Sequence, residues 1–175
     1  MKAYVVRRRA PLAPFQKPAS ELRLRGETVG ARLRGQLAGE GLDLVEVDSL
    51  EEATRAADAL VVQDDLFLSG QLLRRFLAAI PNRRRSYQLE IDRARFPLLS
   101  SRAAPPSYRP LPVFYVGDPG ADPEPLRLDP AVLLVLKQGL PRRIHQVTDP
   151  TVFFLDSFAL QIERWFDVQT ATSLY

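Results

Sequence analysis

Two adjacent carboxylates, Asp64 and Asp65, follow the apolar stretch Leu60–Gln63 and precede an expected helix start at Ser69. In an open α/β sheet, ligands bind in the crevice outside the carboxyl ends of the strands. A hard cation such as Mg²⁺ takes oxygen ligands, usually one or two protein carboxylates together with substrate phosphates. The pair therefore predicts a site for a metal ion, a ribose or a magnesium-bound phosphate. The alternative is a solvated turn whose acids complement the positive start of the next helix.

Basic residues supply the candidate anion-binding groups. Lys17 lies in the loop after the first expected strand, where a doubly wound fold approaches a bound nucleotide, and it could meet a phosphate as a point charge. Three runs, Arg7–Arg9, Arg83–Arg85 and Arg142–Arg143, offer planar guanidinium groups that suit phosphate or carboxylate. The alternative for these runs is a solvated surface. Because the loop after the first strand contains no glycine, a backbone cradle for phosphate is not expected there.

The composition excludes several classes of site. The chain has 175 residues, 46% of them hydrophobic and 26% charged, which is typical of one globular domain. The lack of cysteine excludes disulfides and thiolate chemistry, and the single histidine, His145, excludes a histidine-based metal site. No spanning helix or signal peptide is expected, and a cytoplasmic location is the default. With a net charge of only +3 and no arginine run that alternates with aromatics, nucleic acid is not an expected partner.

The first 80 residues predict alternating strands and helices. Apolar runs predict strands at Lys2–Val6, Leu42–Val47 and Leu60–Gln63, with a short edge strand or a hairpin arm at Leu22–Leu24. Helical spacing and capping residues predict helices over Val29–Leu37, after Ser49 and after Ser69, and prolines make Arg9–Ser20 a loop. This alternation is typical of a mostly parallel sheet with crossover helices.

The second half of the chain gives less regular predictions. Strands are expected over Arg83–Asp92 and Leu111–Val116, with a proline-rich loop over Pro97–Pro112 and a connector over Gly117–Pro125. The segment Ala131–Lys137 fits either a buried strand or a short helix. A final helix is expected at about residues 156–174, where Phe158, Ile162, Trp165 and Phe166 would share one face. The aromatic residues Phe153, Phe154, Trp165 and Phe166 are expected in the core.

Four segments together resemble the sugar-nucleotide nucleotidyltransferases, a GT-A-like family. They are FQKPASELRLRGETVGARL, LAGEGLDLVEV, ALVVQDDLFLS and ERWFDVQTATSLY. The resemblance covers residues 1–80 best and the C-terminus moderately. It implies an α/β fold, a Rossmann-like three-layer sandwich with a mostly parallel sheet, over a single domain of residues 1–175. The last segment resembles the helix that leads into a hexapeptide-repeat β-helix in some members.

The resemblance also implies roles for individual residues. Asp65 takes the place of the metal- and nucleotide-associated aspartate, and Asp64 is its neighbour in the expected Mg²⁺ site. Lys17 matches the phosphate-contacting lysine, so Asp65 and Lys17 are the expected catalytic residues. Gln63 and Arg9 are the expected residues for binding the nucleotide.

The implied activity joins a nucleoside triphosphate to a sugar phosphate. The chain departs from the family in one segment, because VVRRRAPLAPF replaces the glycine-rich loop that wraps the triphosphate. Two alternatives therefore stay open. The chain could be a catalytically inactive nucleotide-sugar-binding or scaffold module, or an interaction domain whose terminal aromatic helix docks onto another subunit. Besides the two substrates, the expected partners are a second copy of the chain or a fused β-helix domain.

Overall fold

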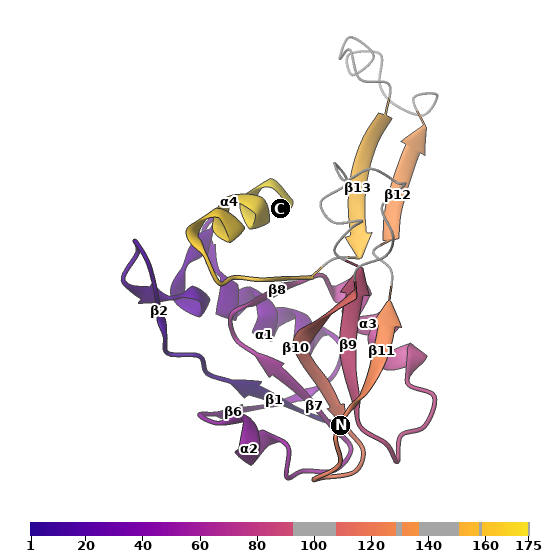
Figure 1. Ribbon diagram of the computed structural model, residues 1–175. Coiled ribbons are helices and arrows are strands. Elements are labelled where there is room, and N and C mark those ends of the chain that lie inside the picture. The colour runs from indigo at the N-terminus through magenta and orange to yellow at the C-terminus, as the bar shows by residue number, and fades with distance from the viewer. Residues whose placement is uncertain (93–107, 129–130, 137–150, 158, 175) are drawn as a thin grey trace.

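A six-stranded sheet organises the chain (Figure 1). The computed structural model describes residues 1–92, 108–128, 131–136, 151–157 and 159–174. The strand order is β11-β9-β10-β7-β1-β6. The strands are β1 (Lys2–Val6), β6 (Asp43–Val47), β7 (Ala59–Gln63), β9 (Tyr87–Asp92), β10 (Tyr108–Val116) and β11 (Glu124–Leu128). Strand β1 therefore lies between β7 and β6, so strands that come later in the chain flank it on both sides.

Most strand pairs in the sheet are parallel. Strand β1 runs parallel to β6 and β7, and β9 runs parallel to β11. Only β10 opposes its neighbours, since it pairs antiparallel with both β7 and β9. The expected Rossmann-like, mostly parallel α/β sheet is confirmed.

Helices cover both faces of the sheet. They are α1 (Val29–Gly39), α2 (Leu50–Ala53) and α3 (Gly70–Ala79). Side chains of α1 and α3 share a core with alternate residues of β1, β7, β9 and β10, whereas Ala53 of α2 packs against the opposite face. The three layers follow from this alternation, because successive strand residues point to opposite faces of a sheet.

Hydroxyl side chains begin each of these helices. The Oγ1 of Thr28 accepts a hydrogen bond from the Ala31 N–H, at 3.1 Å. The Oγ atoms of Ser49 and Ser69 accept equivalent bonds from residues three positions later, at 3.1 and 3.2 Å. Such caps satisfy backbone donors that have no partner inside the helix. The helix starts predicted at Ser49 and Ser69 are therefore confirmed.

Short two-stranded pairs complete the described fold. They are β2 (Pro11–Leu12) with β3 (Lys17–Pro18), β4 (Arg23–Leu24) with β5 (Glu27–Thr28), β8 (Leu66–Leu68) with β14 (Ala159–Gln161), and β12 (Ala131–Leu136) with β13 (Thr151–Ser157). A 3₁₀ turn spans Ala19–Glu21, and helix α4 spans Trp165–Leu174. The β4–β5 pair confirms the hairpin arm expected at Leu22–Leu24, and β12 shows that Ala131–Leu136 is strand rather than helix. The β12–β13 hairpin projects from one end of the molecule (Figure 1).

The prediction of one long C-terminal helix over 156–174 is wrong. Helix α4 begins only at Trp165, and the preceding Ala159–Gln161 pairs antiparallel with β8. The helical spacing of large apolar residues did not distinguish a helix from a strand here, because pairing with β8 buries this segment as a strand. Trp165 is 50% exposed, so its expected place in the core is also wrong.

The proline-rich loop predicted over Pro97–Pro112 also needs correction. Strand β10 already begins at Tyr108 and contains Pro110 and Pro112. Its first residues pair with β9 alone, and the register shifts between Pro110 and Phe114. A proline without an N–H donor is tolerated at such an irregular, one-sided position.

Some sequence predictions fall outside the described residues. Arg142–Arg143, His145 and the segment 97–107 lie there. Among the described residues, no helix has both the length and the apolar character needed to cross a membrane.

Candidate functional site

The run Arg7–Arg9 leaves the sheet at the carboxyl end of β1. The Arg7 N–H donates to the Val47 carbonyl of β6 at 2.9 Å, and the Asp64 N–H donates to the Val6 carbonyl at 3.0 Å. The chain segments after β1, β6 and β7 are thereby held at the same edge of the sheet. This edge is also a topological switch point, because β6 and β7 lie on opposite sides of β1. Ligands of open α/β sheets bind at such points.

A cavity of about 510 Å³ opens at this edge, and we call it the arginine cleft. Four guanidinium groups dominate its lining, together with two carboxylates and two hydroxyls. The lining residues are Arg7, Arg8, Arg9, Pro18, Ser20, Glu21, Thr28, Arg34 and Asp64. A concave site with convergent positive charge is suited to an anionic ligand.

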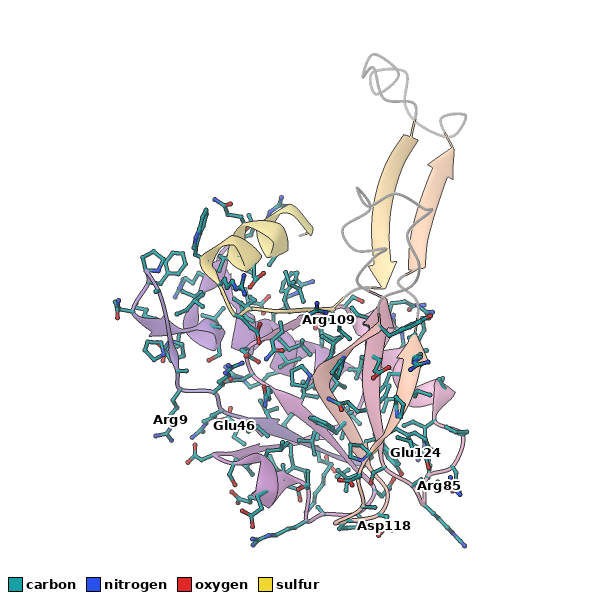
Figure 2. All side chains as sticks on the ribbon, in the orientation of Figure 1. Arg9, Glu46, Arg85, Arg109, Asp118 and Glu124 are labelled. Carbon is teal, nitrogen blue, oxygen red and sulfur yellow. The ribbon has the colours of Figure 1, made fainter. Side chains whose placement is uncertain are left out.

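Acidic residues of β6 and its end hold three of these arginines in place. Arg7 is paired with Glu46, Arg34 lies 3.4 Å from the same carboxylate, and Arg9 donates to Asp48 at 2.8 Å. The hydrogen bond from Arg7 lowers the pKa of Glu46 below its ordinary value. Figure 2 shows Arg9 and Glu46 together on the side of the molecule where β1 and β6 end. Each guanidinium carries five N–H donors, so these pairs leave donors open to solvent.

Arg8 contacts both carboxylates of the acidic pair. Its backbone N–H donates to Asp64 Oδ1 at 2.8 Å, and its Nη1 donates to Asp65 Oδ2 at 2.8 Å. Both acids are buried, with 6% of Asp64 and 1% of Asp65 exposed. The Arg8 side chain remains 43% exposed. One residue therefore donates to two buried acids and still leaves much of its cationic side chain exposed.

The two aspartates face different cavities. Asp64 lines the arginine cleft, and burial raises its pKa above the ordinary value, against hydrogen bonds from Arg8 and Ser20 that lower it. Asp65 lines a second cavity of about 180 Å³, which includes Leu12 and Ile162. Its Oδ2 also accepts from Gln161 Nε2 at 3.2 Å, and its carbonyl accepts from the Ile162 N–H at 3.0 Å.

The structure brings together only some of the residues predicted from the sequence. Asp64 and Arg9 line the arginine cleft, whereas Asp65 lines the smaller cavity, which shares Arg8 with the cleft. Gln63 ends β7 opposite Val6 and lines neither cavity. Lys17 is exposed in the β2–β3 pair and also lies outside both linings. The catalytic and nucleotide-binding roles given to these residues stay predictions.

Sequence reasoning missed several residues of the site. Arg8 was recognised only as one member of a run, although it donates hydrogen bonds to both acids. Arg34 lies on α1, and Gln161 is 96 positions from Asp65 in the chain. No local motif marks either residue, because the sheet and the β8–β14 pair bring them to the site.

The Mg²⁺ expected at Asp64 and Asp65 fits this arrangement poorly. A metal needs carboxylate oxygens that are free to coordinate it. Here Asp64 Oδ1 and Asp65 Oδ2 both accept hydrogen bonds from Arg8, and the side chains line separate cavities. Within the described part of the chain, no group of three or more acidic, histidine or cysteine side chains could hold a metal ion.

No protein-family model and no curated protein matches this sequence. The solved structures that match its fold include two that cover 99% of the chain. One is HddC from Yersinia pseudotuberculosis complexed with GMP-PN, with a TM-score of 0.51 and 10% identity over 99% of that chain. The other is the inositol-1-phosphate CTP transferase from T. maritima, with a TM-score of 0.53 and 12% identity over 96% of that chain. The chain thus shares its fold with these two proteins, and the arginine cleft lies at the topological switch point of its sheet.

Proposed function

We propose that this chain is a divergent nucleotidyltransferase whose arginine cleft binds the phosphates of a nucleoside triphosphate. The single observation that carries the proposal is the convergence of four arginines at the carboxyl ends of β1 and β6. Guanidinium groups match the planar, bidentate geometry of phosphate oxygens. The fold shared with an inositol-1-phosphate CTP transferase supports the same class of reaction.

The proposed second substrate is a sugar phosphate. One of its phosphate oxygens attacks the α-phosphorus of the triphosphate, forming a new P–O bond. The bond from the α-phosphorus to the bridging oxygen breaks, and pyrophosphate leaves with that electron pair. Arg7, Arg9 and Arg34 would stabilise the charge on the leaving group, because positively charged groups fixed in advance favour a transition state that gathers negative charge.

A second candidate function is a nucleotide-sugar-binding module without catalysis. The specific observation in its favour is that Asp65, the expected catalytic aspartate, is already engaged by Arg8 and Gln161. A binding module needs the cationic cleft but needs no carboxylate free for chemistry.

A pyrophosphate-release assay tests the first proposal. The chain is incubated with each common nucleoside triphosphate and a panel of sugar phosphates, with and without Mg²⁺. Release that requires both substrates supports the transferase. Calorimetric binding of a finished nucleotide sugar without any release supports the binding module instead. If the chain neither releases pyrophosphate nor binds a nucleotide sugar, the result contradicts both functions.

A further inference from the structure

We propose that the Arg8 guanidinium takes the place of a divalent cation at the acidic pair, so that the arginine cleft binds phosphates without a metal. The inference rests on the proposed function in one respect, namely that the cleft binds phosphates at all. It goes further by assigning the source of positive charge at Asp65. It also opposes the Mg²⁺ site expected from the sequence.

The first argument is the position of Arg8. Its Nη1 lies 2.8 Å from Asp65 Oδ2, within the charge-assisted hydrogen-bond range, while its backbone N–H holds Asp64 Oδ1. Both contacts come from one residue, so the backbone bond to Asp64 fixes the position from which the guanidinium reaches Asp65. The guanidinium thereby supplies, at Asp65, the positive charge that a divalent cation would otherwise supply to that buried carboxylate.

The second argument is the cost of adding a cation. Asp65 is 1% exposed, and its Oδ2 accepts from both Arg8 and Gln161. Its Oδ1 is buried and accepts no hydrogen bond from the described residues, so one lone acceptor is all that remains. A divalent ion there would lie beside a fixed positive guanidinium, and like charges in a buried setting repel strongly.

The third argument is what Arg8 offers a ligand. Arg8 lines both the arginine cleft and the smaller cavity, and its side chain is 43% exposed. The donors not used by Asp65 are therefore available to a phosphate. Arg7, Arg9 and Arg34, each held by Glu46 or Asp48, add cationic groups around the same cleft.

Calorimetric titration of the full chain with inorganic pyrophosphate tests the inference. It is performed once in EDTA and once in excess Mg²⁺, with controls for magnesium pyrophosphate formation. Dissociation constants that agree within about twofold support a built-in cation, since a twofold change is only about 0.4 kcal/mol. Binding that appears only with Mg²⁺ overturns the inference and leaves the proposed phosphate site intact. Absence of binding in both buffers overturns the inference together with the proposed function.

Substitution of Arg8 gives the second test. We expect Arg8→Gln to weaken metal-free pyrophosphate binding about tenfold or more, through loss of one charge-assisted contact. Mg²⁺ should restore binding in Arg8→Gln, because the competing positive charge beside Asp65 is then gone, but not in Arg8→Gln/Asp65→Asn. The control is Arg85→Gln, an exposed arginine paired with Glu124 near the opposite end of the sheet.

The variants also separate folding from binding. Circular dichroism and thermal melts establish that each variant is folded, and the double variant removes both members of the buried ion pair. If Arg8→Gln alone does not fold, pyrophosphate binding in EDTA is measured on the double variant instead. That binding should be weakened to a similar extent. Unchanged binding in a folded variant, or no Mg²⁺ rescue in a folded Arg8→Gln, overturns the assignment of Arg8 as the substitute cation.

Discussion

The runs Arg7–Arg9 and Arg83–Arg85 look alike in the sequence but lie at opposite ends of the sheet. Arg7–Arg9 follows β1 at the carboxyl ends of the parallel strands, whereas Arg83–Arg85 precedes β9 at their amino ends. Figure 2 shows Arg9 and Arg85 on well-separated sides of the molecule. Both runs are exposed, so exposure alone does not distinguish a ligand site from a solvated surface.

The turn around Arg83–Arg85 contributes mainly through its backbone. The hydroxyl of the buried Tyr115 lies 2.8 Å from Asp58 Oδ1 and 3.0 Å from the Arg83 carbonyl oxygen, and the two acceptors share its single O–H donor. Gly117 packs so closely that a Cβ there would overlap the Arg85 carbonyl oxygen. The Arg85 guanidinium itself makes an exposed pair with Glu124. This turn therefore fixes the amino end of the sheet.

The difference shows what turns an arginine run into a candidate site. At the carboxyl end, Arg7–Arg9 meets buried acids from β7 and paired acids from β6 around a cavity. At the amino end, none of the described cavities is lined by Arg83–Arg85. Four predictions test this contrast.

Gly117→Ala should give the largest effect. The added methyl group would overlap backbone atoms of Arg83 and Arg85 that have no flexible end to move. We expect the free energy of unfolding to fall by about 3 kcal/mol, at the upper end for overpacking. Urea unfolding measures it, with Gly35→Ala as the matched control. A Cβ at Gly35, in helix α1, meets nothing within 4 Å, so that variant should gain about 0.5–1 kcal/mol. A Gly117→Ala chain as stable as the parent would contradict the structural role of the turn.

Arg34→Gln should weaken ligand binding without a comparable loss of stability. Arg34 lines the cleft from α1, so its removal should raise the pyrophosphate dissociation constant about tenfold, or about 1.4 kcal/mol. Arg85→Gln should leave the constant unchanged. Calorimetry on both variants makes the comparison direct. Equal weakening by the two substitutions would mean that net charge, rather than the cleft, determines binding.

Tyr115→Phe should destabilise the amino end by about 1–2 kcal/mol, because it removes a buried hydroxyl and leaves the Arg83 carbonyl and Asp58 without that donor. Burial, with the hydrogen bond to Asp58, raises the pKa of Tyr115 to about 12. Thermal unfolding measures the loss of stability. Pyrophosphate binding should not change, and a weakened affinity would show that the two ends of the sheet are coupled.

Asp64→Asn should have the smallest effect, visible in the pH dependence of stability. Burial raises the folded-state pKa of Asp64 from its ordinary value of 3.8, so the folded chain holds this proton more tightly than the unfolded chain. The resulting stabilisation is complete below the ordinary pKa and is lost as the pH rises through the raised value. We expect Asp64→Asn to remove that contribution in urea unfolding across this range. Parallel pH profiles for the two proteins would rule it out.

Much of the fold was predictable because its signals are local. The alternation of strand and helix through residue 80, with caps at Ser49 and Ser69, depends on side chains close in sequence. Strands β11 and β14 were not predicted. Glu124–Leu128 has little apolar character, and Ala159–Gln161 becomes a strand by pairing with β8, about 90 positions earlier. Long-range pairing of this kind leaves no mark in a local pattern.

The candidate site likewise combines features that the sequence determined with features that only the tertiary structure decided. The sequence alone determined that a carboxylate pair follows β7, that a basic run follows β1, and that no cysteine chemistry is available. Only the tertiary structure decided that Asp64 and Asp65 face different cavities and that Arg8 joins them. The physical reason is distance along the chain. Arg8 and Asp65 are 57 positions apart, and parallel pairing of β1 with β7 is what places their charges within 2.8 Å.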